Sequence, residues 1–409
     1  MSDDLPSLHH SVIGLDVHQA KINACWIHQN EQGEKTVEHR EFGGFQRDRR
    51  ALAQWAAACH PEIVVMESTG IYWRSPYAAL ERMGIRAWVV NARHVKTVPG
   101  RKTDVADAQW LAMLARAGLL RASFIPEATI REARLIAHYR QKVVGMLSAE
   151  KNRLHKVLAD TGIRLNVLVS DLHGKTARSM VKALVAGRST ADIVAMAGLL
   201  RADRQELREA LQAESWSVTH RALLGHILQH IEMLETQIAT LDAELAEQLR
   251  PWQASLQLLQ TLPGIDAPGA ALLLAEIGGD MRCFGSAERL ASWAGICPGN
   301  NESAGKRKSG RIRQGNLWLK RLLCEMAQAA ARTRCSLKAK FESLSARKGY
   351  KKSVVALAHK MLRIIYAMLS KNQPYRDASV NYEELMVERN APRWLKMLGK
   401  YGYLAPQPA

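Results

Sequence analysis

The chain has 409 residues, 47% of them hydrophobic, so it is long enough for two or three domains with buried cores. Its net charge of +18 argues against a cationic partner and indicates a polyanion or an acidic surface. The six cysteines form no Cys-x-x-Cys pair, and neither a secretory signal nor an 18-residue apolar run is seen, so we expect no zinc site, no disulfide framework and no membrane span, and a cytoplasmic location.

The first 125 residues alternate between predicted strands and helices. Two apolar runs within residues 12–26 flank a short turn and predict a β-hairpin, and residues 37–42 predict a third strand. Helices are expected at residues 46–58, 72–83 and 103–120, and buried strands at residues 62–66 and 85–90. This order of elements is that of a ribonuclease-H-like sheet, which predicts an α/β domain over residues 10–125.

Four carboxylates stand at notable places in this predicted domain. Asp16 lies in the middle of the first strand, Glu67 ends the strand at residues 62–66, and Asp104 and Asp107 begin the last helix, three residues apart on one face. Because neighbouring parallel strands end at one edge of a sheet, the four side chains can meet there. Carboxylate oxygens suit hard divalent cations, and four of them could hold two Mg²⁺ ions that clamp a phosphodiester.

Each carboxylate also has an ordinary explanation. Asp16 could simply face water from an edge strand, and Glu67 could be an ordinary charged residue of a loop. Asp104 and Asp107 would sit favourably in a first helical turn, where the helix dipole attracts negative charge. The coincidence of all four within one order of elements favours the metal site.

The middle of the chain is predicted to be helical. Residues 127–160 and 176–249 read as helices, of which residues 220–249 form a long amphipathic helix with coiled-coil character. We therefore expect a helical linker over residues 126–255.

The chain changes character at residues 256–298, where residues 259–278 predict a helix, a tight turn at Pro263-Gly264-Ile265 and a second helix. Backbone amides at such a turn can meet a phosphate at the second helix, which is typical of a helix-hairpin-helix, although an ordinary αα-hairpin has the same pattern. Further helices are expected at residues 317–331 and 353–369. The last domain is then mostly helical over residues 256–370, with a peripheral tail at residues 371–409.

Most of the positive charge lies in this last domain. Residues 299–363 contain 17 Lys/Arg and 3 Asp/Glu, which favours contact with phosphates. Residues 296–316 read as a loop rich in Gly, Ser, Lys and Arg, and Ser303 stands there beside three cations. A hydroxyl nucleophile needs such cations to stabilise developing charge, but composition alone favours the alternative that Ser303 and Ser309 only hydrogen-bond phosphates. The expected nucleic-acid contacts are Lys306, Arg307, Lys308, Arg311, Arg313 and Lys320.

Several motifs together resemble one family, the DEDD transposases of the IS one-ten and IS eleven-eleven insertion sequences. In order, they are Ile13-Gly-Leu-Asp-Val-His18, Met66-Glu-Ser-Thr-Gly70, Asn91 with Lys96 and Lys102-Thr-Asp-Val-Ala-Asp-Ala108, Leu262-Pro-Gly-Ile265 with Leu274-Ala-Glu-Ile-Gly278, Ala294-Gly-Ile-Cys-Pro298, Ser303-Ala-Gly-Lys306, and Gly315-Asn316 with Leu319. They extend over about residues 11–365 in the order of the family.

The resemblance implies a RuvC-like domain, a helical linker and a C-terminal transposase domain. It implies that Asp16, Glu67, Asp104 and Asp107 bind Mg²⁺ and that Ser303 is a nucleophile that bonds covalently to DNA, with Ser309 as the alternative. It also implies dimers or tetramers in which the acidic site and the serine come from different subunits. Donor and target DNA would be chosen by a structured noncoding bridge RNA, at the bacterial nucleoid.

The sequence is therefore interpreted as an insertion-sequence transposase or site-specific recombinase that transfers DNA strands. One rival is a metal-dependent nuclease resembling a Holliday-junction resolvase, which keeps the four carboxylates and makes Ser303 dispensable. A second rival is a non-catalytic nucleic-acid-binding protein, in which the loss of Asp16 and Glu67 leaves every activity intact.

Overall fold

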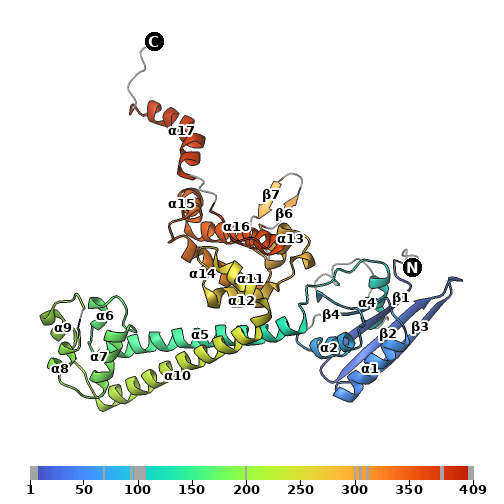
Figure 1. Cartoon of the computed structure of the whole chain (residues 1–409), viewed down its shortest axis with the longest axis horizontal. Helices are drawn as coiled ribbons and strands as arrows, with labels where there is room; N and C mark the ends of the chain where they lie inside the picture. The colour runs from blue at the N-terminus through green and yellow to red at the C-terminus, as the bar shows by residue number, and fades with distance from the viewer. Residues whose placement is uncertain are drawn as a thin grey trace, which may run out of the picture. The chain divides into compact units, whose positions relative to one another are not determined.

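The computed structural model describes residues 8–67, 70–92, 95, 107–198, 200–298, 301–303, 306–309, 312, 314–377 and 382–403 (Figure 1). Contacts within the chain divide it between Ile125 and Pro126 into two compact units. The four-part division expected from the sequence is finer than this, and its inner boundaries, near residues 255 and 370, stay predictions.

The N-terminal unit is built on a five-stranded sheet in the order β3-β2-β1-β4-β5. The strands are β1 (Ser11–Val17), β2 (Lys21–Gln29), β3 (Lys35–Gly43), β4 (Ile63–Glu67) and β5 (Ala87–Val90). The first three strands pair antiparallel, whereas β4 pairs parallel to both β1 and β5. This topology confirms the ribonuclease-H-like sheet that the order of elements predicts.

Helices cover both faces of the sheet. On one face, α1 (Gln46–Ala58) and α2 (Arg74–Arg82) bury their apolar side chains against alternate residues of the strands, including Ile13, Leu15 and Met66. On the other face, α4 (Asp107–Arg116) packs over Val12 and Val65. Because alternate strand residues point to opposite faces, these two clusters define which side chains face α4. The expected start of the last helix, near residue 103, lies outside the described residues.

Two long helices dominate the next part of the chain, α5 (Ala128–Asp160) and α10 (Val218–Gln248) (Figure 1). They run antiparallel, because hydrogen bonds join Asp160 to His220 near one end and Glu132 to Gln248 near the other. Val143 of α5 is buried against Leu234 and Leu241 of α10. The ends of both helices lie within about two residues of those predicted from the sequence. The short helix η1 (Arg250–Trp252), which contains Pro251, follows α10.

Four short helices connect α5 to α10. They are α6 (Leu165–Leu168), α7 (Lys175–Val185), α8 (Thr190–Ala195) and α9 (Arg204–Ala210), and they share one core with the adjoining ends of α5 and α10. The described residues of this segment thus form a small helical insert at the far end of the α5–α10 pair, which Figure 1 shows clearly.

The remaining helices form a bundle around α16 (Tyr350–Lys371). Its contacts are with α11 (Gln253–Gln260), α13 (Ala287–Ala294), α14 (Leu317–Ala330), α15 (Ser336–Lys348) and η2 (Met281–Cys283). By length and composition α16 could cross a membrane, but its apolar residues, such as Leu357, Met361 and Ile365, are buried in this bundle. The apolar helix α12 (Ala267–Ile277) packs on α11, α14 and α5.

The structure differs from expectation in three places of this bundle. The segment expected to be a loop at residues 296–316 contains two paired strands, β6 (Asn301–Ser303) and β7 (Lys306–Ser309). Helices α13 and α15 were not foreseen as separate elements. The tail contains a further helix, α17 (Tyr382–Lys400), which contacts α15 and exposes apolar side chains such as Trp394 and Leu395.

Candidate functional site

The register of the sheet places Asp16 beside Glu67. Strands β1 and β4 pair parallel with Leu15 opposite Met66, and Asp16 and Glu67 are the next residues on their strands. Asp16 lies on the same face of the sheet as Val12 and Gly14, and Glu67 lies on the same face as Ile63 and Val65. Since Val12, Ile63 and Val65 belong to the cluster buried under α4, the two carboxylates lie on that same face.

Helix α4 brings Asp107 to the same face of the sheet. Its backbone lies directly on Gly14, where an added Cβ atom would stand 2.0 Å from the Ala108 carbonyl oxygen and 2.7 Å from the Ala112 nitrogen. Gly14 is two residues before Asp16, and Asp107 begins the helix immediately before Ala108. The close approach at Gly14 therefore fixes the start of α4 over the strand that carries Asp16.

Polar groups surround Asp16 on this face. The Nε2 atom of His18 lies 3.0 Å from Oδ2 of Asp16, whose side chain is 22% exposed. Asn23 on β2 is paired with Asp16 across the strands. Glu67 is half-buried and Asp107 is exposed. Solvent therefore reaches this end of the sheet, where a substrate can reach the carboxylates.

The predicted set of four carboxylates is only partly described. Asp16, Glu67 and Asp107 share one face and one end of the sheet, whereas Asp104 lies outside the described residues. Among the residues that the structure describes, no three acidic, histidine or cysteine side chains are close enough to hold a metal ion together. The donor chemistry still fits a hard divalent cation, since the carboxylates supply only oxygen atoms.

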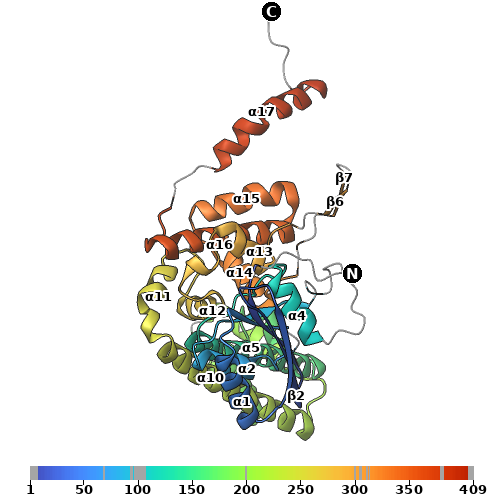
Figure 2. The ribbon, with the colours of Figure 1, turned by 90° about the vertical axis from the view of Figure 1, so that its right-hand side faces the viewer.

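Ser303 lies at the tip of a two-stranded ribbon. Asn301 pairs with Ser309 and Ser303 pairs with Lys306, and Pro298 forms a further bridge with Ile312. We call residues 298–312 the serine hairpin. Figures 1 and 2 both show its strands extending away from α13 and α16. Ser303 is thus at the turn end of the hairpin, and Ser309 is nearer its base.

The base of the serine hairpin is closely packed. An added Cβ atom on Gly315 would stand 2.5 Å from the Gly295 nitrogen and 2.6 Å from the Ala294 carbonyl oxygen. Gly295 ends α13 in the left-handed conformation, with φ at 71°. Only glycine allows the two ends of the hairpin to approach so closely, so both of its ends are held against α13.

The expected nucleic-acid contacts fall in or just after this hairpin. Lys306, Arg307 and Lys308 form most of β7, and Lys320 lies in the first turns of α14. Arg311 and Arg313 lie outside the described residues. Their roles stay predictions.

The turn at Pro263-Gly264-Ile265 joins α11 to α12, as the sequence predicts. Gly264 has φ at 89°, and an added Cβ atom there would stand 2.4 Å from the Met326 carbonyl oxygen of α14. Asp266 caps α12 by accepting a hydrogen bond from the Gly269 nitrogen at 2.8 Å. Gly264 therefore serves packing against α14, and phosphate contact by this turn stays a prediction.

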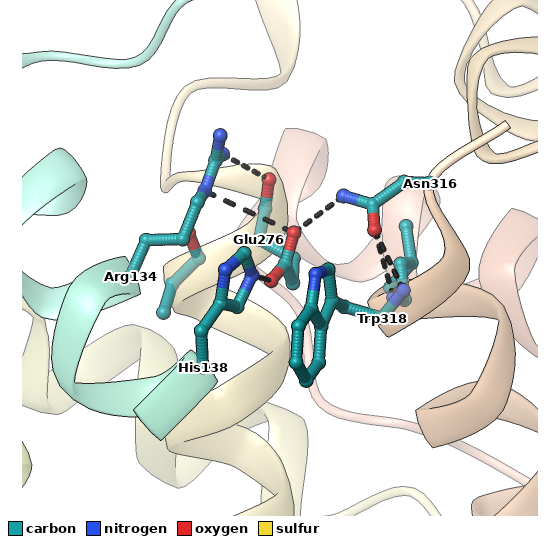
Figure 3. A network of polar contacts seen from close by, with 7 residues as sticks. Arg134, His138, Glu276, Asn316 and Trp318 are labelled. Carbon is teal, nitrogen blue, oxygen red and sulfur yellow. Dashed lines mark hydrogen bonds and ion pairs between the residues drawn. The ribbon is translucent and has the colours of Figure 1, made fainter. Parts of the chain in front are cut away.

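One buried cluster was not foreseen as part of the site. Glu276 is the only charged residue of α12 and is fully buried, and its side chain contacts His138, Arg134 and Asn316 (Figure 3). Asn316 directly precedes α14 and follows Gly315 at the base of the serine hairpin. The one sequence signal for this cluster is an acidic residue inside an otherwise apolar helix.

Comparisons with known proteins found two family models and a solved structure that match parts of the chain. A family model described as "Transposase", for the DEDD transposases of IS110, matches residues 13–163, and one described as "Transposase IS116/IS110/IS902 family" matches residues 256–342. Thermus thermophilus RuvC matches 28% of this chain and 99% of its own, with 13% identity and a TM-score of 0.22.

Relatives extend over nearly the whole chain. A probable family 20 transposase of Pseudomonas aeruginosa is 27% identical over 90% of this chain and 98% of its own length. The transposase for insertion sequence element IS1111A of Coxiella burnetii is 25% identical over 89% of this chain and 91% of its own. A pilin gene-inverting protein of Moraxella bovis is 23% identical over 89% of this chain and 97% of its own length. The two family models together match more than half of the chain, which belongs to the DEDD transposases of the IS110/IS1111 insertion sequences.

Proposed function

We propose that the protein cuts and rejoins DNA at the ends of an insertion sequence, using the carboxylates of the sheet and Ser303. The observation that carries this proposal is the placement of Asp16, Glu67 and Asp107 at one end and on one face of a ribonuclease-H-like sheet. Relatives named as transposases and as pilin gene-inverting proteins support the rejoining of strands as well as their cutting.

Ser303 supplies the nucleophile in this proposal. Its hydroxyl oxygen forms a bond to a DNA phosphorus atom, the bond to one deoxyribose oxygen breaks, and that oxygen leaves as a hydroxyl after taking a proton. The serine proton passes to water or to a carboxylate. A hydroxyl of the second strand then attacks the phosphoserine and releases Ser303. Each step exchanges one phosphoester for another, so rejoining needs no external energy source.

The carboxylates provide the metal part of the proposed site. Asp16, Glu67 and Asp107, with Asp104, would hold Mg²⁺, which supplies stabilisation of the negative charge on the attacked phosphate. His18 lies 3.0 Å from Asp16 and fixes the direction of that carboxylate. We propose a divalent cation because all four donors are oxygen ligands.

Basic residues of the C-terminal bundle would hold the DNA. Lys306, Arg307 and Lys308 lie on the strand that pairs with Ser303, which would bring phosphates to the nucleophile. A second group of exposed cations surrounds the corner between α15 and α16, at Arg347, Lys348, Lys351 and Lys352. The helix-hairpin-helix at residues 253–277 is a further candidate for contact with the DNA backbone.

Two partners belong to the proposal without support from geometry. A structured noncoding bridge RNA would select donor and target, and the helical linker and the N-terminal unit would share its binding. A dimer or tetramer would combine the carboxylates of one subunit with Ser303 of another. Both follow from the family resemblance alone.

A recombination assay in cells tests the proposed site. A donor plasmid with the element, a target plasmid and the flanking noncoding RNA are supplied together with wild type, Asp16→Ala, Ser303→Ala or Ser309→Ala. We expect Asp16→Ala and Ser303→Ala to abolish joined products, because each removes one half of the chemistry. Ser309→Ala, the matched control on the same hairpin, should keep them.

Other outcomes select the rivals. If Ser303→Ala recombines normally and Ser309→Ala does not, then Ser309 is the nucleophile. If DNA is nicked in a metal-dependent way without either serine, the protein is a resolvase-like nuclease. If Asp16→Ala and Glu67→Ala leave every activity intact, the protein binds nucleic acid without catalysis.

A further inference from the structure

Glu276 is an unusual residue for its place in the fold. Helix α12 is otherwise apolar, and the residues around Glu276, from Gly269 to Ile277, are buried with it. An ionised carboxylate in such surroundings is costly unless charged and hydrogen-bonding partners compensate for lost water. The partners of Glu276 come from two other elements, α5 and the segment that precedes α14 (Figure 3).

Helix α5 supplies the cationic side of this cluster. Oε1 of Glu276 lies 2.5 Å from Nε2 of His138, and Oε2 lies 3.8 Å from Nε of Arg134. Arg134 also donates hydrogen bonds to the carbonyl oxygens of Ala275, at 3.0 Å, and Glu276, at 2.7 Å. Because a carboxylate only accepts, Nε2 of His138 must carry a proton. The carboxylate is thus held from one side by α5.

Asn316 holds the other side of the carboxylate and begins α14. Its amide nitrogen donates a hydrogen bond to Oε2 of Glu276. Its amide oxygen accepts hydrogen bonds from the Trp318 nitrogen, at 3.0 Å, and the Leu319 nitrogen, at 3.1 Å. The Trp318 ring stacks on His138 with ring centres 4.2 Å apart and planes inclined by 15°. One amide therefore both caps α14 and joins it to Glu276.

The same amide stands at the base of the serine hairpin. Gly315, the preceding residue, packs against Ala294 and Gly295 at the other end of that hairpin. The Ser303–Lys306 pair lies at the opposite end of the hairpin from the Pro298–Ile312 bridge. A change of direction at the base would therefore displace the tip, and a displacement of about 1 Å can cost about 100-fold in rate for an aligned nucleophile.

We propose that Glu276 is a positioning residue, which fixes the direction of the serine hairpin by holding Asn316 against Arg134 and His138. The inference rests on the proposed role of Ser303. The residue touches no DNA in this account and acts only through Asn316. Removal of the Glu276–Asn316 hydrogen bond should lower the yield of the serine–DNA adduct without a matching loss of DNA affinity.

A polarity swap tests this link. In Asn316→Asp, the cap oxygens for Trp318 and Leu319 remain, but two carboxylates face each other. In Glu276→Gln, an amide nitrogen faces the Asn316 amide nitrogen. In the double variant, the amide introduced at position 276 can accept from His138 and donate to the carboxylate introduced at position 316. The full-length protein is used throughout, and Asp203→Asn, at the cap of α9, controls for a changed cap.

Four measurements separate positioning from stability. They are amide hydrogen exchange at residues 296–312, the yield of covalent serine–DNA adduct, the affinity for donor DNA, and the melting temperature. We expect each single variant to speed exchange and to lower the adduct yield by about 100-fold, and the double variant to restore both. DNA affinity should stay within about two-fold.

Two outcomes would contradict the proposed role of Glu276. If the single variants exchange and react as wild type does, or if the double variant is as defective as the worse single variant, Glu276 does not position the hairpin. Should a single variant fail to fold, the double variant decides alone, since it must fold and show wild-type exchange. If Ser303→Ala still yields the adduct, the proposed nucleophile is wrong, while the exchange comparison still decides the role of Glu276.

Discussion

At the scale of single residues, the sequence identified the acidic positions but not what holds them together. Asp16 and Glu67 stood out because a carboxylate in or beside an apolar strand needs a partner. Gly14 carried no such signal, although its missing side chain is what admits the backbone of α4. No local pattern predicts the role of Glu276, because its partners His138 and Asn316 are distant in sequence. Such contacts depend on tertiary packing, which no local pattern encodes.

Divalent cations should stabilise the N-terminal unit through these carboxylates. A cation that binds only the folded state raises its free energy of unfolding by about 2.7 kcal/mol at 100 times the dissociation constant. We therefore expect the melting temperature of the full-length wild type to rise with millimolar Mg²⁺ and to fall back with EDTA. The Asp16→Asn variant should show neither change, whereas Glu31→Gln, at the opposite end of the sheet, should respond as wild type does. An equal response of Asp16→Asn would place the cation elsewhere.

At the scale of elements, long periodic segments were predicted well and short polar ones were not. The pattern of α5 and α10 extends over many helical turns, so their ends were close to those expected. The serine hairpin has strands of three and four residues, and β7 reads Lys-Arg-Lys-Ser, which has no alternation of apolar and polar residues. Its pairing depends instead on the glycine-packed base at Gly295 and Gly315.

The packing of α7 on α10 should depend on pH. Arg178 donates two hydrogen bonds to Glu235, at 2.6 and 2.7 Å, and they hold the pKa of Glu235 below its ordinary value of 4.5. A lowered pKa contributes stability above the unfolded value, and that contribution is lost as the pH falls through the folded value. A partly exposed pair of this kind contributes up to about 1 kcal/mol.

Glu235→Gln should therefore melt at a lower temperature than wild type at pH 7, and the difference should shrink as the pH falls below about 4.5. Calorimetry at several pH values measures this. Glu247→Gln, whose carboxylate is 72% exposed, is the matched control on the same helix and should differ little from wild type at any pH. A difference for Glu235→Gln that does not vary with pH would contradict the ion pair.

The corner between α15 and α16 should contribute to DNA binding mainly through phosphates. Four cations and Tyr350, which is 54% exposed, surround Gly349 there. Each phosphate contact adds about 0.9 to the slope of log affinity against log salt. Lys351→Ala combined with Lys352→Ala should lower that slope by about 1.8, as measured by fluorescence anisotropy with duplex DNA. The same pair of changes at Arg188 and Arg201, exposed in the helical insert, should leave the slope unchanged.

At the scale of the whole molecule, the chain separates the two sets of residues that we propose to react. The carboxylates belong to the unit before Pro126, and Ser303 belongs to the unit after it. The sequence predicted this order from the motifs alone. That the carboxylates and the serine come from different subunits stays a prediction from the family resemblance, because it depends on association between chains.

Mixing two inactive variants tests whether one site draws on two chains. Asp16→Asn and Ser303→Ala should each abolish recombination, whereas their mixture should regain activity if the carboxylates and the serine come from different subunits. In randomly mixed dimers, about a quarter of the shared sites would be intact. Activity should therefore approach about a quarter of the wild-type level, measured with donor and target plasmids. No recovery, with mixed dimers demonstrated by differential tags, would place both groups in one chain.

The antiparallel pairing of α5 and α10 also affects the order in which the chain can fold during translation. Residues 161–217 must be translated before α10 begins, which takes roughly 3–12 s at about 5–20 residues per second. The compact N-terminal unit ends at Ile125, so its sheet can fold during that interval. Until α10 emerges, Val143 of α5 lacks Leu234 and Leu241, which cover it in the folded protein, so this part of the long helix stays open to water and to other nascent chains.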